Sequence, residues 1–106
     1  MRNLDFVVSG QIIKPDPLCD FTGIVPGSRG YLFARFRFSA DWAGCKRAAV
    51  FVHTNGQEYA VPLANNTCEI PPEALTGLVV RVYVVGQRGA VRIPTNKTAF
   101  PQTGRR

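Results

Sequence analysis

The chain has few of the residues on which metal proteins and many enzymes depend. Among its 106 residues it holds one histidine, His53, and three cysteines, Cys19, Cys45 and Cys68. A single histidine excludes sites built from several histidines, and the cysteines lack the paired spacing of a zinc ribbon or finger. An odd number of cysteines without close pairs also argues against a disulfide scaffold and favours a reducing cytoplasm. We therefore expect neither a metal nor another cofactor.

Long apolar segments are lacking as well. The most apolar stretch covers residues 78–85 and is interrupted by Arg81, whereas a membrane-spanning helix needs about 20 apolar residues. Residues 1–10 include Arg2, Asp5 and Ser9, so they do not contain the apolar region of a signal peptide. We expect no insertion into a membrane.

Acidic residues are scarce relative to basic ones. Seven Asp and Glu face 13 Lys and Arg, which gives a formal charge of +6. Such a balance is compatible with binding to nucleic acid, with binding to an acidic protein surface, or with solubility alone. The hydrophobic share of 45% is sufficient for one packed core. We expect one domain over residues 1–100, followed by a mobile tail over residues 101–106.

The clearest periodicity lies between Tyr31 and Trp42, where apolar residues alternate along the chain. Period two predicts a half-buried strand that ends at Trp42. The even positions should face the core, and the odd positions should form an outer face with basic and aromatic side chains. Our predicted core residues here and further along the chain are Leu32, Phe36, Phe38, Trp42, Phe51, Ile70 and Val82. The predicted outer-face residues are Tyr31, Phe33, Arg35 and Arg37.

Further strands are predicted by short β-prone runs with turn residues between them. Residues 47–53 and 58–63 should form a hairpin, because Asn55-Gly56 tolerates the positive φ angles of a type I′ turn. Pro62 removes one ladder donor and places the second strand at a sheet edge. At most one helical turn is expected, near Pro71–Leu75. About seven or eight short strands favour an all-β antiparallel sandwich, with a small barrel as the alternative.

Catalytic chemistry has little support in this sequence. His53 could pair with Cys45 or Cys68, but the plainer interpretation is a histidine at the end of a hairpin strand and small buried cysteines. Asp16 and Asp20 match no paired-carboxylate or metal motif and are expected to be solvated loop residues. We expect no enzyme and assign no catalytic residue.

Nucleic-acid binding is a sharper alternative. Tyr31 and Phe33 could stack on bases while Arg35 and Arg37 contact phosphates. The same side chains could equally form a solvated outer face or meet a partner subunit. The remaining basic residues are scattered along the sequence, so no continuous basic stripe can be read from it.

The order of several short motifs is more specific than composition. It consists of Gly27-Ser28, Tyr31-Leu32, Phe36-Arg37-Phe38-Ser39, Asp41-Trp42, Ala49-Val50-Phe51, Cys68-Glu69-Ile70-Pro71, Val82-Tyr83-Val84-Val85-Gly86 and Arg92-Ile93-Pro94-Thr95-Asn96. Over about residues 5–100 this order resembles the immunoglobulin-like module at the N-terminus of baseplate upper proteins and head-fibre proteins of phages that infect Gram-positive bacteria.

The resemblance implies an immunoglobulin-like β-sandwich that is a structural piece of a virion, without catalysis or cofactor. We expect a capsid decoration or head-fibre-base protein that docks on the assembled shell. A tail or baseplate component is the first alternative, and a small basic nucleic-acid-binding protein is the second. In the relatives a longer fibre or receptor-binding region usually follows the module, whereas this sequence stops at Arg106, so we do not carry the fibre and host-recognition functions of the relatives over to this chain.

The expected partners are capsid or other virion proteins, with copies of the chain itself as a further alternative. Aromatic and arginine side chains are enriched in the centres of protein interfaces. Tyr31, Phe33, Arg35 and Arg37 are therefore the predicted contact residues. Among the landmark residues, Gly86 is expected to permit a turn that a side chain would obstruct.

Overall fold

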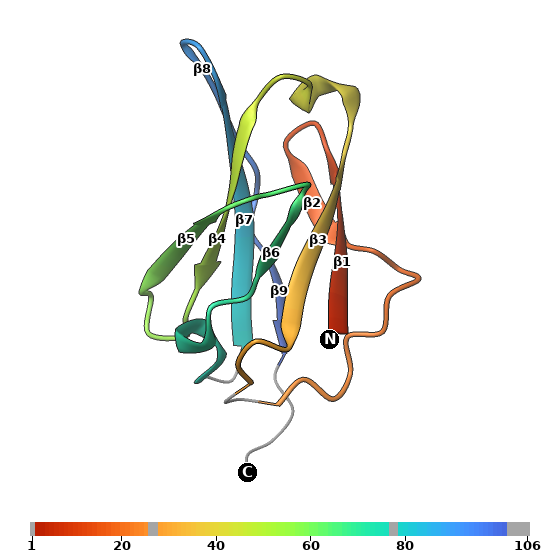
Figure 1. Cartoon of the computed structure of the whole chain (residues 1–106), viewed down its shortest axis with the longest axis vertical. Coiled ribbons are helices and arrows are strands. Elements are labelled where there is room, and N and C mark those ends of the chain that lie inside the picture. Colours follow the sequence, from red (N-terminus) through yellow and green to blue (C-terminus); the bar gives the residue numbers. More distant parts are fainter. Residues whose placement is uncertain (1, 26–27, 77–78, 102–106) are drawn as a thin grey trace.

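The computed structural model describes residues 2–25, 28–76 and 79–101, and in that part of the chain it contains nine strands in two packed sheets (Figure 1). This confirms the all-β sandwich. The strands are β1 (Arg2–Ser9), β2 (Ile12–Pro15), β3 (Leu32–Phe38), β4 (Lys46–Val52), β5 (Glu58–Pro62), β6 (Thr67–Glu69), β7 (Val79–Arg88), β8 (Val91–Pro94) and β9 (Thr98–Pro101). Two short 3₁₀ turns, η1 (Ala40–Trp42) and η2 (Pro72–Thr76), complete the elements, and η2 is the predicted helical turn.

Sheet A has the strand order β2-β1-β3-β6 and departs from the predicted antiparallel arrangement at one pairing. Strands β1 and β3 run parallel, with Leu4 opposite Ala34 and Phe6 opposite Phe36. Parallel neighbours need a crossover of a dozen residues or more. The connection between Pro15 and Leu32 is long enough for that crossover, and it carries the chain back to the start of β1.

Sheet B has the order β5-β4-β7-β8, and β9 also pairs with β7. Strand β9 pairs with the first half of β7, over Val79–Val82, while β8 pairs with its second half, over Val85–Arg88. The predicted hairpin is present as β4 and β5, and β5 is an edge strand, as Pro62 predicted. Asn96 lies between β8 and β9, and its Oδ1 accepts the backbone N–H of Ile13 at 2.8 Å. This hydrogen bond ties sheet B to β2.

The type I′ turn predicted at Asn55-Gly56 is not formed there and occurs instead at Asn65-Asn66. In the β4–β5 connection only Gly56 has a positive φ, of 92°, so no type I′ turn forms at Asn55-Gly56. Asn65 and Asn66 do have positive φ angles, of 53° and 59°. Backbone hydrogen bonds in both directions between Ala64 and Thr67 close that two-residue turn, which is the geometry of a type I′ hairpin.

Trp42 is fully buried, although not as the end of a strand. Strand β3 ends at Phe38, and η1 then turns the indole ring into the core. The indole Nε1 donates to the carbonyl of Gly10 at 2.8 Å. On its other side the ring lies against Gly86 of β7, where an added Cβ would be 2.5 Å from Trp42 Cζ3. Trp42 therefore links the β1–β2 turn of sheet A to sheet B.

The turn expected at Gly86 does not form there. Gly86 lies within β7, opposite Arg47 on one side and Ile93 on the other, and the chain turns only after Arg88. Glycine is needed at position 86 because the indole ring of Trp42 occupies the space of a side chain. It is a packing glycine rather than a turn glycine.

Aromatic rings fill the centre of the sandwich. Phe6 stacks on Phe36 at a centroid distance of 5.3 Å and meets Phe21 edge-on at 5.4 Å. The predicted core residues Leu32, Phe36, Trp42, Phe51, Ile70 and Val82 are all buried, whereas Phe38 is half-buried and packs against this core. Of the predicted tail, Pro101 belongs to β9, and residues 102–106 lie outside the described residues.

Candidate functional site

The four predicted contact residues lie along one strand. Tyr31 directly precedes β3 and is 51% exposed, and Phe33, Arg35 and Arg37 follow it on the outer face of sheet A. Phe33 is half-buried, while the two arginines are exposed. The structure therefore places these side chains on one surface, as the alternation predicted.

Both arginines of this surface are bound to carboxylates of the same chain. The parallel register sets Arg35 opposite Asp5, and its Nε and Nη2 donate to the two carboxylate oxygens at 2.7 and 3.0 Å. The hydrogen bond from Arg35 and its positive charge lower the pKa of Asp5, against a smaller opposing effect of burial. Arg37 Nη1 lies 3.2 Å from Asp16 Oδ2. The charges of the predicted phosphate contacts are thus neutralised within the molecule.

Asp16 differs from the prediction for a solvated loop residue. It is only 7% exposed, and its Oδ1 accepts the backbone N–H of Leu18 at 2.9 Å while its other oxygen meets Arg37. Buried carboxylates need such partners, since desolvation of an unpaired charge is costly. Asp16 therefore orders the start of the long connection to β3.

The candidate nucleophiles and base do not come together. Cys45 and His53 flank the two ends of β4, which places them roughly 25 Å apart at the rise of a strand. Cys68 lies in β6 of the other sheet, where burial raises the pKa of its thiol to about 12. His53 Nδ1 accepts the backbone N–H of Asn55 at 3.0 Å, within the β4–β5 turn. This geometry gives His53 a structural role in the β4–β5 turn.

A surface absent from the predictions is the outer face of sheet B. Its outward positions are apolar on neighbouring strands: Ala48, Val50, Val52, Ala60, Pro62, Val79, Tyr83, Val85, Pro94 and Ala99. Val50 and Val52 point away from the core, yet only 7% and 6% of their surface is exposed, because their neighbours on this face cover them. The centre of the face is thus a close-packed apolar layer on the outside of the protein.

Positive side chains border this apolar layer, and one of them, Arg81, lies within it between Val52 and Ala99. Lys46, Arg81, Arg92 and Lys97 lie on or beside its outward positions, and Lys97 Nζ is 5.6 Å from the centre of the Tyr83 ring. The described outward positions include one carboxylate, Glu58, which accepts a hydrogen bond from the hydroxyl of Tyr83 at 2.9 Å. Burial and this hydrogen bond raise the pKa of Tyr83, so the phenol remains a donor at neutral pH. These outward positions therefore carry four positive side chains and one carboxylate, and that carboxylate already accepts a hydrogen bond from Tyr83.

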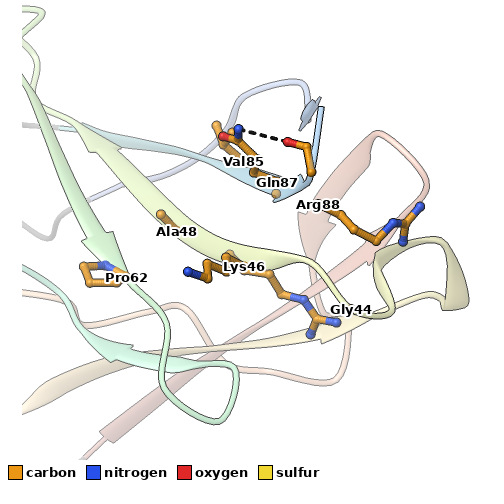
Figure 2. Close-up of a pocket in the computed structure, with 10 residues that line it drawn as sticks. Gly44, Lys46, Ala48, Pro62, Val85, Gln87 and Arg88 are labelled. Atoms are coloured by element: carbon orange, nitrogen blue, oxygen red, sulfur yellow. Dashed lines mark hydrogen bonds between the residues drawn. The ribbon is translucent and has the colours of Figure 1, made fainter. Parts of the chain in front are cut away.

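One end of the face is hollowed. An open hollow of about 610 Å³ lies over β4 and β7, beside the turn between β7 and β8. Figure 2 shows Ala48 on β4, Pro62 on β5, and Val85 and Gln87 on β7 around it. Lys46 and Arg88 also line it, but the Arg88 guanidinium points away from Ala48, Pro62 and Val85 in Figure 2 and donates to the carbonyl of Ala43 at 2.6 Å. The hollow therefore has mostly apolar walls, and Lys46 is the cation beside them.

The sequence does contain a signal for this face. In a strand with one solvated side, residues of one parity should be polar, but residues 48–52 and 79–85 are apolar on both parities, apart from Arg81. Since β5, β8 and β9 flank β4 and β7 in the same sheet, the second apolar parity lies on the outside.

No family model, curated protein or solved structure matches this chain. Over residues 2–25, 28–76 and 79–101, no helix has the length and apolar character required to cross a bilayer. Within the same ranges, no three His, Cys, Asp or Glu side chains are grouped so that they could hold a metal ion.

Proposed function

We propose that the chain is a structural protein of a bacteriophage virion, a capsid decoration or head-fibre-base protein that docks on the assembled shell through its sandwich. The motif order set out above gives this proposal its biological setting. The structural observation that carries it is the outer face of sheet B, where ten outward positions are apolar and basic side chains lie among and beside them. Such a surface is typical of a protein interface.

Docking of this kind depends on many weak contacts. A sandwich of 106 residues presents a modest interface, and interfaces of that size give low affinity unless copies act together. On a symmetric shell each copy is held beside its neighbours, so weak contacts add through effective concentration. The proposed role requires a rigid scaffold and an apolar docking face rather than a reaction centre.

Nucleic-acid binding is less well supported. Arg35 and Arg37, the predicted phosphate contacts, are paired with Asp5 and Asp16. Arg2 and Arg47 are also committed, since Arg2 donates to the carbonyls of Asp20 and Thr22, and Arg47 donates to Asn66 and to the carbonyl of Trp42. Phosphate binding by these arginines would have to break their internal bonds, so we do not propose nucleic-acid binding through them as a second function.

Quantitative mass spectrometry of purified particles of the encoding phage tests the proposal. A copy number close to that of the capsid subunit would support decoration of the shell. A few copies, in proportion to a tail ring, would move the protein to the tail or baseplate. Absence from particles would refute the virion role. Salt titration of binding to single-stranded DNA is the companion measurement, because phosphate contacts weaken steeply as salt rises.

A further inference from the structure

We propose that the outer face of sheet B binds a segment of an acidic protein, in which apolar side chains are flanked by carboxylates. This inference rests on the binding role proposed above, but it does not depend on the location of the chain in a virion. It names the chemistry of the partner at that surface. Charge, shape and the sheet edges each support it.

The charge of the face selects an acidic partner. Lys46, Arg92 and Lys97 border the apolar layer and Arg81 lies within it, while the carboxylate of Glu58 is already engaged by Tyr83. Complementary charges at an interface rim steer association and exclude partners of like charge. A second copy that presented the same face would bring the two basic rims together. The face is therefore unsuited to a symmetric dimer and suited to a partner with carboxylates.

The shape of the face selects apolar side chains at one position. Within the hollow of about 610 Å³, Ala48, Pro62 and Val85 form the walls, and Lys46 lies beside them (Figure 2). The alanine leaves space that a larger residue would fill. An apolar side chain of the partner can occupy this space, and a carboxylate beside it in the partner sequence then meets Lys46.

The edges of the sheets favour binding across the face rather than by strand addition. The edge strands β2, β5, β8 and β9 all end in proline, at Pro15, Pro62, Pro94 and Pro101. Proline has no N–H to donate to an added strand. Each of these prolines removes one donor at a strand end, which favours side-chain contacts over β4 and β7.

Nuclear magnetic resonance titration with two capped peptides tests the proposal on the full chain. One peptide has leucine-valine-leucine between two glutamates, and the other has the same centre between two lysines. We expect the glutamate peptide to shift the amides of Lys46, Ala48, Val85 and Gln87, and the lysine peptide to bind about tenfold more weakly. Reversing the rim charge with Lys46→Glu and Arg92→Glu should invert this preference. Lys14→Glu, on the outer face of sheet A, is the matched control and should leave it unchanged.

Each other outcome overturns the proposal. Equal binding of both peptides would mean that charge does not select the partner. Shifts confined to Tyr31, Phe33, Arg35 and Arg37 would place binding on sheet A, and a lack of shifts at the peptide solubility limit would remove the site. Stronger shifts of the same face with a short oligothymidylate would make it a nucleic-acid surface, and concentration-dependent dimerisation through it would make a second copy the occupant. Particle mass spectrometry fails or succeeds independently, so loss of the virion role leaves this result readable.

Discussion

The outer faces of the two sheets differ in how their charged side chains are paired. On sheet A, Arg35 and Arg37 form ion pairs with Asp5 and Asp16 of the same chain. On sheet B, basic side chains lie among and beside apolar residues and the described outward positions supply one acid, Glu58. An internally paired surface gains little from a partner, because binding would have to replace bonds that already exist. Basic side chains among and beside apolar residues gain both charge pairing and burial.

Prominent residues are therefore not always the best indicators of an interface. Arginine next to aromatics on β3 has the composition of an interface centre, but the parallel register places a carboxylate opposite Arg35. The alanines, valines and prolines on sheet B are individually unremarkable. Their value lies in being adjacent on neighbouring strands, which is a property of the fold.

Removal of the Trp42 side chain from the core between the two sheets should have the largest effect on stability. Trp42→Ala deletes a fully buried indole that contacts both sheets, and we expect a loss of about 3 to 5 kcal/mol in the free energy of unfolding. Urea denaturation followed by circular dichroism measures it. Trp42→Phe keeps part of the packing but loses the hydrogen bond to Gly10, so its loss should be smaller. Equal stability of Trp42→Ala and the parent would contradict the role of the ring as the link.

A smaller loss of stability is expected when a side chain is added at Gly86 of sheet B, where the indole ring of Trp42 occupies the space. Gly86→Ala places a Cβ 2.5 Å from Trp42 Cζ3, and we expect destabilisation of about 1 to 3 kcal/mol. The neighbouring exposed Gln87→Ala is the control and should change stability by less than about 0.5 kcal/mol. Because the clash needs the indole, Gly86→Ala should cost less in a Trp42→Phe background. An identical cost in both backgrounds would refute the packing explanation.

The ion pair between Asp5 and Arg35 on sheet A can be broken by a substitution at Asp5. Asp5→Asn should reduce stability at neutral pH by about 0.5 kcal/mol, since the pair with Arg35 is largely solvent-exposed. The folded state lowers the pKa of Asp5 below its usual 3.8, so the contribution is present above about pH 4 and is lost as the pH falls through the folded value. The difference between parent and variant should therefore shrink on acidification. A double-mutant cycle with Arg35→Gln gives the coupling, and Asp41→Asn is the control.

The smallest effect on stability should come from charge placed on either face. Ala60→Lys on sheet B and Asn3→Lys on sheet A are both at exposed outward positions, and each should change the free energy of unfolding by less than about 0.5 kcal/mol. Thermal denaturation of both variants checks this. A large loss for Ala60→Lys alone would mean that the apolar layer of sheet B is part of the core rather than a docking surface.

Local patterns predicted most of the strands. Period two placed Leu32, Ala34 and Phe36 on the buried face of β3, and proline at position 62 placed β5 at an edge. These features depend on residues close in sequence, where alternation and missing donors act directly.

Long-range relations could not be predicted in this way. The parallel pairing of β1 with β3 depends on the path of the connection between them, which has no periodicity. The role of Gly86 depends on Trp42, which is far away in sequence and reaches it only in the folded sandwich. The outer face of sheet B depends on which strands become neighbours. In each case the decisive partner is supplied by the topology.

The prolines at the strand ends have a consequence for crowding. A protein held in many copies on one shell would bring its sheets close together, which is the condition under which open sheet edges join into cross-β aggregates. In this chain the edge strands β2, β5, β8 and β9 end at Pro15, Pro62, Pro94 and Pro101, and Pro71 lies two residues after β6. Dense arrays of the folded chain should therefore remain separate particles rather than fuse through their backbones.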